Sequence, residues 1–516
     1  MDDASSADFL DAELAFETSN ANSGSRWPTT AAADNRLFPN CRPQLKPKFI
    51  VDPNARVFAI GSCFARNIEE YLARVGMDVI STQIEFPAAE MSHGARHNDL
   101  LVKYTPPSIL QELRFALDET CTFEDQLKFL APLRSGLSVD LTLPSWYSAV
   151  KPGRAIERRR QITALFSKIR SADLVIMTLG LIETWYDRQA DGFICEVPSR
   201  DLLIEYPRRF AFFRLDYEQA RAYTSECIEL IRKVNPAVKI VLTTSPVPLG
   251  RTFSGDDIIV ANGYSKAVLR SVAGSLTLTD PSLDYYPSFE MVMLSDPRDS
   301  WASDQRHVTD SRVGDVVRSF ISSYVPDASG DIRAQYVDAK ILASRNDFRS
   351  ALEKMIPLES FFPGDRQFLN DLCLAAEGAR EDGLALEVHE KLDQVGETSV
   401  VRQMRRAQCY TRLGRHAEAL DIANSIGPGH IGARLTKIDS LIQLKRTKDA
   451  REFADETLEQ IRNGGDRVPR NGWVYDWLEN CYRLLGASRE MDAVRALRAI
   501  NIGLVGLNST VSVAGC

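Results

Sequence analysis

Short apolar runs alternate with longer amphipathic segments between about residues 48 and 325. The short runs are rich in β-branched residues and are predicted to be strands: 56–60, 77–81, 173–178, 238–243 and 276–279. The longer segments repeat apolar positions every three to four residues and are predicted to be helices: 64–75, 108–117, 155–169, 217–234, 262–272 and 311–324. Nearly continuous apolar strands are typical of a parallel sheet covered on both faces. The pattern predicts a doubly wound α/β domain with its sites at the carboxyl ends of the strands.

The strand pattern stops at Pro326-Asp-Ala-Ser-Gly-Asp331, which is predicted to be a linker. Four of the helical segments that follow resemble one another, and each is centred on an alanine: Ala385, Ala419, Ala450 and Ala493. The first two steps are 34 and 31 residues, close to the ~34-residue period of tetratricopeptide (TPR) repeats, and the last is 43. We therefore predict an all-α, TPR-like repeat domain over 332–516, with an irregular helical bundle as the alternative.

Composition limits the classes of function. The chain has 516 residues and a net charge of −8, which argues against a mainly electrostatic grip on nucleic acid. Its nine cysteines are scattered without C-x-x-C pairs, so neither a disulfide framework nor a zinc finger is predicted. We expect no cofactor and no nucleic-acid partner.

The N-terminal 25 residues contain six acidic residues and no Lys or Arg, unlike a secretory signal. No run approaches the ~18 apolar residues that a membrane-spanning helix needs. We therefore expect a cytoplasmic protein with a mobile tail over 1–46, followed by an α/β domain over 47–325.

Ser62 is the first candidate for chemistry. The first predicted strand ends in Val57-Phe-Ala-Ile-Gly-Ser-Cys63, and an amphipathic helix begins directly after it. Ser62 is thus expected at a strand end and at or near a helix N-cap, where free N–H groups and the helix dipole would stabilise an oxyanion. The alternative is that Ser62 only caps the helix.

Asp304 and His307 lie three residues apart, just before the last predicted helix of the α/β domain. On a helical turn, this spacing lets the carboxylate hold the imidazole in the tautomer that a general base needs. The alternative is a capping Asp followed by a surface His.

The segment Gly61-Ser-Cys-Phe-Ala65 resembles the signature of the GSCFA family. The resemblance covers about residues 47–325 and continues in order through five segments: Thr178–Trp185, Thr244–Pro248, Asn262–Lys266, Tyr286–Glu290 and Asp304–His307. That family looks related to the SGNH/GDSL hydrolases, which implies a flavodoxin-like three-layer α/β/α sandwich. The resemblance also implies that Ser62 is the nucleophile and that Asp304 and His307 complete the triad.

The sequence departs from the SGNH pattern in one block. SGNH hydrolases have a Gly-x-Asn-Asp segment whose Asn donates to the oxyanion hole, whereas Ile182 takes that position in Gly180-Leu-Ile-Glu183. The remaining candidates for oxyanion or substrate contacts are the backbone N–H groups of Ser62 and Cys63, the side chains of Asn98 and Asn262, and the strand-end residues Gly180 and Glu183. A packing or surface role is equally expected for Glu183.

Cys63 is a rival nucleophile, since a thiol with a His base is sound chemistry; the alternative is a buried structural Cys. His93 and His97 are four residues apart, but no third ligand is evident, and we expect no metal.

Other charged and His residues are expected to be structural. The run Arg158–Arg160 is expected to form a solvated helix face, with binding of an anionic substrate as the alternative. We expect His389, His416 and His430 to lack acidic or thiol neighbours at ligand or catalytic spacing.

Two classes of function remain. The first is a serine esterase or O-acyltransferase that acts on an acylated small molecule or carbohydrate through an acyl-enzyme on Ser62. The second is an inactive SGNH-like domain in a binding protein whose TPR-like region holds a protein partner. Hydrolysis and transfer share the acyl-enzyme, so the sequence does not separate them.

Overall fold

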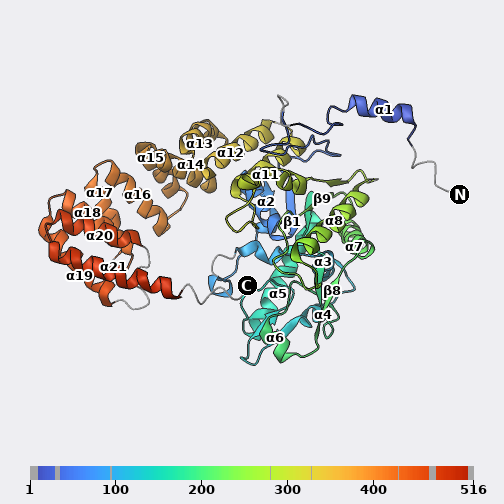
Figure 1. Ribbon diagram of the computed structural model, residues 1–516, viewed down its shortest axis with the longest axis horizontal. Coiled ribbons are helices and arrows are strands. Elements are labelled where there is room, and N and C mark those ends of the chain that lie inside the picture. Colours follow the sequence, from blue (N-terminus) through green and yellow to red (C-terminus); the bar gives the residue numbers. More distant parts are fainter. Residues whose placement is uncertain are drawn as a thin grey trace. The chain divides into compact units, whose positions relative to one another are not determined.

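A computed structural model of the chain describes residues 10–29, 35–92, 96–278, 280–326, 328–427, 429–463 and 472–508. The chain divides into two compact units, Met1–Arg345 and Asn346–Cys516. The first unit contains a parallel five-stranded sheet in the order β10-β9-β5-β1-β2. Its strands β1 and β9 are labelled in Figure 1. Its strands are β1 (Arg56–Gly61), β2 (Asp78–Val79), β5 (Leu174–Leu179), β9 (Lys239–Thr244) and β10 (Leu283–Tyr285).

This strand order is flavodoxin-like, because in chain order the strands lie 2-1-3-4-5 across the sheet. The order reverses between β1 and β5, which pair directly, with Gly61 opposite Thr178. Ligands of such sheets bind outside the carboxyl ends of the strands at this switch point. The residues that follow β1 and β5 therefore occupy the expected position of a site.

Helices cover both faces of the sheet. One face packs against α3 (Pro106–Leu117), α5 (Pro152–Ser167), α7 (Tyr217–Val234) and α8 (Ile258–Thr277), in a core that contains Phe58, Met177 and Leu242. The other face packs against α2 (Cys63–Arg74), α9 (Ser288–Met293) and α11 (Asp310–Tyr324). The predicted three-layer α/β/α sandwich is confirmed.

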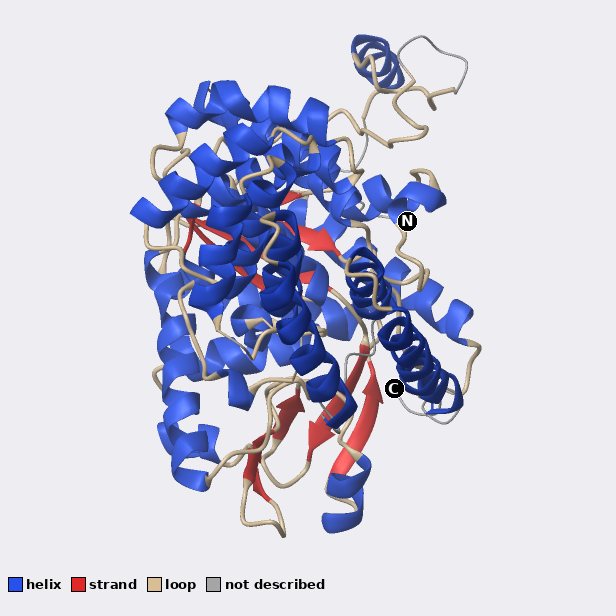
Figure 2. Cartoon of the chain, turned by 90° about the vertical axis from the view of Figure 1, so that its left-hand side faces the viewer, coloured by secondary structure: helices blue, strands red, loops and turns tan. Residues whose placement is uncertain are grey.

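The fifth strand was predicted in the wrong place. Residues 276–277 end α8, and the strand that pairs with β9 is Leu283–Tyr285. The true strand has only three residues, one of them Asp284, and so carries no apolar run to detect. The sequence pattern also did not predict two antiparallel sheets (Figure 2), formed by β3 (Leu130–Pro132) with β4 (Ser138–Asp140), and by β6 (Glu183–Asp187), β7 (Gly192–Ile194) and β8 (Phe210–Arg214).

The first unit extends beyond the expected boundary at residue 325. Residues 328–331 of the expected linker belong to α12 (Ala328–Ser344), which packs on α11. The contact is close, since a Cβ on Gly314 would lie 2.6 Å from Cγ1 of Ile341. Arg333 Nε of α12 also donates to the Val75 carbonyl at 3.0 Å. Packing against α11 thus makes α12 part of the α/β unit.

The expected N-terminal tail is partly anchored. Cys41 N–H donates to Ser295 Oγ at 2.8 Å, and Asp296 N–H donates to the Pro39 carbonyl at 2.8 Å. Residues 39–41 are therefore tied to the segment that follows α9. Upstream, Ala12–Ala21 form α1, and residues 1–9 and 30–34 lie outside the described residues.

The second unit consists of helix pairs. Its described helices are α13 (Phe348–Met355), α14 (Arg366–Gly378), α15 (Asp382–Gln394), α16 (Val400–Arg412), α17 (His416–Ile426), α18 (Ile431–Gln443), α19 (Thr447–Asn463), α20 (Gly472–Leu484) and α21 (Ser488–Asn508). The four alanines that marked the sequence repeat each lie in the second helix of a pair, and three of them are buried: Ala385, Ala419 and Ala450. The predicted helical-repeat region is confirmed.

The same turn joins the two helices of each of these four pairs. A residue with positive φ stands two positions before the second helix: Arg380, Gly414, Lys445 and Gly486. The next N–H bonds a carbonyl five residues earlier, as from Arg415 to Tyr410 at 2.8 Å. This is the Schellman helix ending, which favours glycine at the left-handed position. Arg380 and Lys445 carry a Cβ, so the left-handed conformation costs free energy at these two positions.

Replacing Lys445 by Gly should therefore stabilise the second unit by about 0.5–1 kcal/mol, because it relieves the left-handed strain of a side-chain-bearing residue. Gly414→Ala is the matched control and should destabilise the unit, since φ is +74° there and no atom lies within 4 Å of the added Cβ. Urea unfolding followed by circular dichroism measures both changes. A Lys445→Gly protein less stable than wild type would contradict the prediction.

Candidate active site

Ser62 lies at the N-terminus of α2, directly after β1. Its side chain makes no capping hydrogen bond, although Ser62 occupies the N-cap position. The residue is 2% exposed, and its Oγ has no hydrogen-bond partner in the described part of the chain. An unpaired buried hydroxyl costs about 1–3 kcal/mol. The interpretation of Ser62 as only a helix cap is therefore wrong, and its free hydroxyl needs another explanation.

Two glycines allow the chain to pack closely around Ser62. Gly61 has φ +136°, and a Cβ there would lie 2.2 Å from the Thr178 carbonyl oxygen. A Cβ on Gly180 would lie 2.7 Å from the Tyr104 carbonyl oxygen and 3.2 Å from the Ser62 Cβ. The turn after β5 thus lies close to the Ser62 side chain, and a residue larger than glycine at position 180 would not allow this approach.

Asp304 and His307 form the predicted pair. His307 Nδ1 lies 2.5 Å from Asp304 Oδ2, and Asp304 Oδ1 accepts from the backbone N–H groups of His307 and Arg306, both at 3.0 Å. These hydrogen bonds hold the pKa of Asp304 well below its usual range. The ionised carboxylate fixes the proton on Nδ1, which leaves Nε2 as the basic nitrogen. The pair lies in an exposed turn with Gln305 at φ +56°, not in the first turn of a helix.

The serine and the histidine are not joined by a hydrogen bond. Ser62 Oγ has no partner in the described part of the chain, so no direct hydrogen bond joins it to His307. The turn of His307 nevertheless reaches the same edge of the sheet. Arg306 Nε lies 3.5 Å from the carbonyl oxygen of Pro248 in the loop after β9. The Arg306 charge also acts on the pKa of Cys63, the neighbour of Ser62.

The rival nucleophile Cys63 is a poor thiolate. Burial raises the pKa of its thiol, and the opposing effects of Arg306, Lys266 and Arg96 are smaller. The thiol is therefore protonated at neutral pH, and a protonated thiol is a weak nucleophile. This environment favours Ser62 over Cys63.

Several oxyanion candidates are already engaged. The Ser62 N–H donates to the Thr178 carbonyl at 3.2 Å, and the Gly180 N–H donates to the Tyr104 carbonyl at 3.2 Å. Asn98 donates its amide to Glu69 at 2.6 Å inside a buried cluster behind α2. Asn98 is thus structural, and Gly180 acts through its small size.

Glu183 also has a structural role. Its two carboxylate oxygens accept from Thr252 Oγ1 at 2.6 Å and from the Phe253 N–H at 2.9 Å, which fixes the loop before α8. Asn262 accepts from the Leu249 N–H at 3.1 Å through Oδ1, and this leaves its NH₂ group as a donor. The Cys63 N–H belongs to the first turn of α2, where N–H groups have no intrahelical acceptor. Cys63 N–H and the Asn262 amide are the remaining oxyanion candidates.

Sequence reasoning missed Lys266, although it stands in one of the family-like segments. Its side chain is 3% exposed, and Nζ donates to the carbonyls of Gly180 at 2.8 Å and Val247 at 2.7 Å. Burial lowers the pKa of Lys266 to about 7. One turn of α8 thus ties together the loops that follow β5 and β9. A lysine in an amphipathic pattern gives no sign that it points inward.

The expected solvated face over Arg158–Arg160 is wrong for two of its three residues. Arg159 is fully buried and pairs with Glu112 at 2.6 Å, while Arg158 lies 3.8 Å from Glu90. Their positive charges are compensated within the fold, which removes the case for an anionic substrate there.

The His93 and His97 pair gives no metal site that can be described. His97 Nδ1 accepts from the Phe86 N–H at 2.9 Å, and His93 lies outside the described residues.

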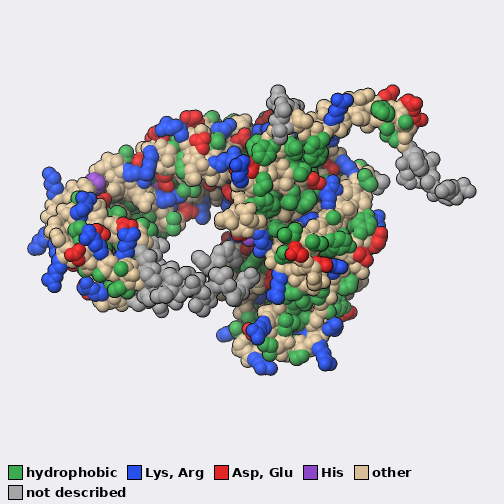
Figure 3. Space-filling model, viewed as in Figure 1, with side chains coloured by type: hydrophobic (Ala, Val, Ile, Leu, Met, Phe, Trp, Pro, Cys, Tyr) green, Lys and Arg blue, Asp and Glu red, His purple; other side chains and the backbone are tan. Residues whose placement is uncertain are grey.

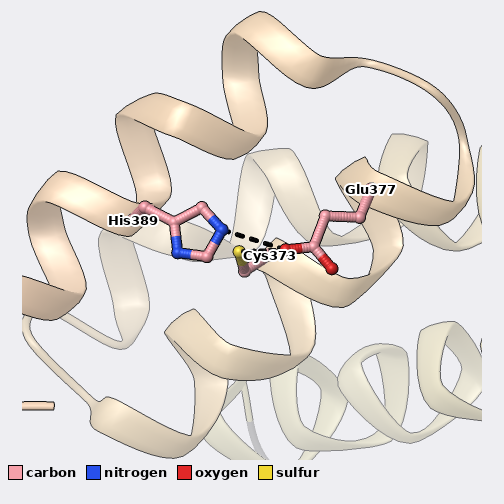
Figure 4. Close-up of side chains that lie close together, drawn as sticks. All are labelled: Cys373, Glu377 and His389. Atoms are coloured by element: carbon pink, nitrogen blue, oxygen red, sulfur yellow. Dashed lines mark hydrogen bonds and ion pairs between the residues drawn. The ribbon is translucent and has the colours of Figure 1, made fainter. Parts of the chain in front are cut away.

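The second unit contains a cluster that the sequence did not indicate. Cys373, Glu377 and His389 bring ligand-type atoms within 4.8 Å of one another (Figure 4). His389 Nε2 lies 3.0 Å from Glu377 Oε1, and Cys373 Sγ donates to the same oxygen at 3.4 Å. The expectation that His389 lacks acidic and thiol neighbours is therefore wrong. The neighbours belong to the preceding helix, α14, and only packing brings them together.

The surroundings of this cluster favour an ion-pair network over a metal. Arg402 NH1 lies 3.5 Å from His389 Nδ1, and because Arg only donates, the ring proton belongs on Nε2, facing Glu377. A metal at Nε2 would need the opposite tautomer. Arg405 also pairs with Glu377 at 3.4 Å, and burial lowers the pKa of His389.

A flavodoxin-like sheet with a serine at its switch point and an Asp–His pair at the same edge defines a hydrolase-like α/β domain. The sequence profile of the GSCFA family matches residues 56–320, and the chain belongs to that family. A comparison with curated proteins gives no match. Among solved structures, the chain is similar to a thermophilic TPR protein of Thermus thermophilus, at 16% identity and a TM-score of 0.23, over 34% of this chain and 91% of that one. No described helix has the length and apolar character needed to cross a membrane.

Proposed function

We propose that the α/β unit is a serine esterase or O-acyltransferase that forms an acyl-enzyme on Ser62. The observation that carries the proposal is the buried, unpaired Ser62 hydroxyl at the switch point of the sheet. The ionised Asp304 and its hydrogen bond to His307 add a base of fixed tautomer at the same edge. Family membership supports a hydrolase-like domain.

In the proposed mechanism, His307 Nε2 takes the proton from Ser62 Oγ as Oγ attacks the acyl carbon. The oxyanion that forms lies against the N-terminus of α2, where the Cys63 N–H and the helix dipole stabilise it. The tetrahedral intermediate collapses, and His307 gives its proton to the leaving alcohol. Water or an acceptor hydroxyl then attacks the acyl-enzyme by the same steps in reverse.

The reaction requires movement around Ser62. Its Oγ is buried and not bonded to His307, so substrate binding has to expose the hydroxyl and bring the 302–307 turn closer. Catalytic hydrogen bonds commonly tighten only when substrate binds. The exposed position of His307 is consistent with such an adjustment.

The proposed substrate is an acylated small molecule or carbohydrate, and the proposed location is the cytoplasm. On the face shown in Figure 3, Lys and Arg side chains are interspersed with Asp and Glu, and apolar side chains gather over the α/β unit. Such mixed charge, like the net charge of −8, does not favour a broad nucleic-acid surface.

The proposed activity predicts a burst of product from an aryl acetate, because acylation of Ser62 releases one equivalent of phenol before slower turnover. Stopped-flow absorbance measures the burst, and an added sugar acceptor separates hydrolysis from transfer. Asp304→Asn should slow the burst by less than His307→Ala does, since Asp304 only orients and stabilises the imidazolium. Wild-type protein without product above the buffer rate would contradict the proposal.

That contradictory result would favour the alternative, an inactive domain in a binding protein. Under either function, we propose that the second unit binds a protein partner. Stacked helix pairs expose extended surfaces that suit such binding. Val401 and Trp473, which are large, apolar and exposed, lie on helices of this unit.

A further inference from the structure

Lys266 is a buried cation without a carboxylate partner. No Asp or Glu oxygen in the described part of the chain lies within ion-pair distance of its Nζ. Other buried cations of the same unit do have one: Arg66 pairs with Glu69, Lys103 and Arg159 with Glu112, and Arg209 with Asp187. A buried charge is costly unless it is paired. The fold compensates these cations with carboxylates, whereas Lys266, which bonds the carbonyl of Gly180 next to Ser62, has none.

Lys266 is connected to Ser62 through Gly180. Nζ holds the Gly180 carbonyl at 2.8 Å, and the Gly180 Cα faces the Ser62 Cβ so closely that a methyl group there would lie 3.2 Å from it. The second bond, to the Val247 carbonyl at 2.7 Å, fixes the loop after β9, where Arg306 also rests. An ammonium group has three N–H donors, so one remains beyond these two carbonyls.

We propose that Lys266 is a positioning residue of the Ser62 site, whose ammonium group clamps the Gly180 and Val247 loops and supplies positive charge behind the oxyanion. The proposal rests on the proposed acyl-enzyme function. In the SGNH pattern, the side-chain amide of an Asn donates to the oxyanion, and here Ile182 takes the position of that Asn. In the proposal, the charge of Lys266 takes over the role of this amide. The negative charge that Lys266 lacks in the resting fold arises during the reaction.

The charge of Lys266 should depend on pH near neutrality. Burial lowers its pKa to about 7, and the charged or titratable groups that face it are Cys63 of α2 and Arg306 of the 302–307 turn. Cys63 is neutral because burial raises its pKa, so Arg306 is the charge that opposes protonation. Reactivity of Ser62 should therefore fall as the pH rises through about 7 to 8.

The shifted pKa of Lys266 should also make stability depend on pH. In the unfolded chain the pKa of Lys266 returns to 10.5, so between about pH 7 and 10.5 the unfolded state binds more protons than the folded state. The free energy of unfolding should therefore rise with pH in this range.

The test compares rates of Ser62 labelling by a fluorophosphonate across pH 6–9 in four full-length proteins: wild type, Lys266→Met, Lys266→Arg and Ser265→Ala. Ser265 is the matched control, because its Oγ accepts from the Ile182 N–H in the same loop but carries no charge. We expect Lys266→Met to label about 10- to 100-fold more slowly at pH 6, where the wild-type lysine is charged. Lys266→Arg should recover much of the rate and lose the fall above pH 7, and Ser265→Ala should keep the wild-type pH profile.

Lys266→Met labelled at the wild-type rate would overturn the proposal. If that variant does not fold, Lys266→Arg decides: a rate that stays level from pH 7 to 9 supports the proposal, and a fall parallel to that of wild type overturns it. A wild-type protein that is not labelled at all would instead overturn the acyl-enzyme function. The two failures are thus distinguishable.

Discussion

Ser62→Ala should lower ester cleavage or acyl transfer by a factor on the order of 10³ or more, and His307→Ala should do the same. Without the Oγ nucleophile or its base, only oxyanion stabilisation and binding remain. The change should not harm the fold, because Ser62 Oγ makes no hydrogen bond that alanine would lose. Steady-state hydrolysis of an aryl acetate measures the effect, with circular dichroism to show that each variant is folded.

Cys63→Ala is the matched control, one residue along the chain. It should retain most of the activity, since the thiol is protonated and any contribution to the oxyanion site comes from the backbone N–H. The opposite pattern, with Cys63→Ala inactive and Ser62→Ala active, would make this a thiol enzyme. Product formation no faster than the buffer rate in wild type and both variants, with no phosphonate adduct, would favour the binding-protein alternative.

Gly61→Ala should prevent stable folding of the α/β unit. The added Cβ would lie 2.2 Å from the Thr178 carbonyl oxygen, and neither partner can move because β1 and β5 are paired inside the sheet. The φ of +136° adds backbone strain. Together these effects should lower the free energy of unfolding by more than about 4 kcal/mol, which is exceptional for a single substitution. Urea unfolding, with soluble yield as a second measure, records the loss.

Gly255→Ala separates the strain from the overlap. Gly255 also has positive φ, +86°, but no atom lies within 4 Å of the added Cβ. The free energy of unfolding of this control should fall by only about 1–2 kcal/mol. A Gly61→Ala protein as stable as Gly255→Ala would show that β1 and β5 do not pack as described.

Most of the sheet could be predicted because its central strands are apolar at nearly every position. β1, β5 and β9 begin and end within a residue of the predicted strands, and Ser62 follows β1 as expected. The pairing of Asp304 with His307 is local and could also be predicted. β10 was misplaced because a three-residue strand with a central Asp284 has no such pattern.

What the sequence did not predict depends on contacts between distant segments. Asn98 and Glu183 were candidates for substrate contacts, but Glu69 and the 252–253 loop use their polar groups. In the sequence, Lys266 resembles an ordinary helix lysine, and only the fold places it against the loops that follow β5 and β9. Likewise, His389 meets Glu377 only because α14 and α15 pack together.

The most direct test of the central claim is to treat the full-length protein with a fluorophosphonate and to map the adduct by peptide mass spectrometry. The proposed acyl-enzyme predicts a single adduct on Ser62, lost in Ser62→Ala and kept in Cys63→Ala. An adduct on a different serine, or no adduct on a folded protein that an aryl acetate shows to be active, would contradict Ser62 as the nucleophile.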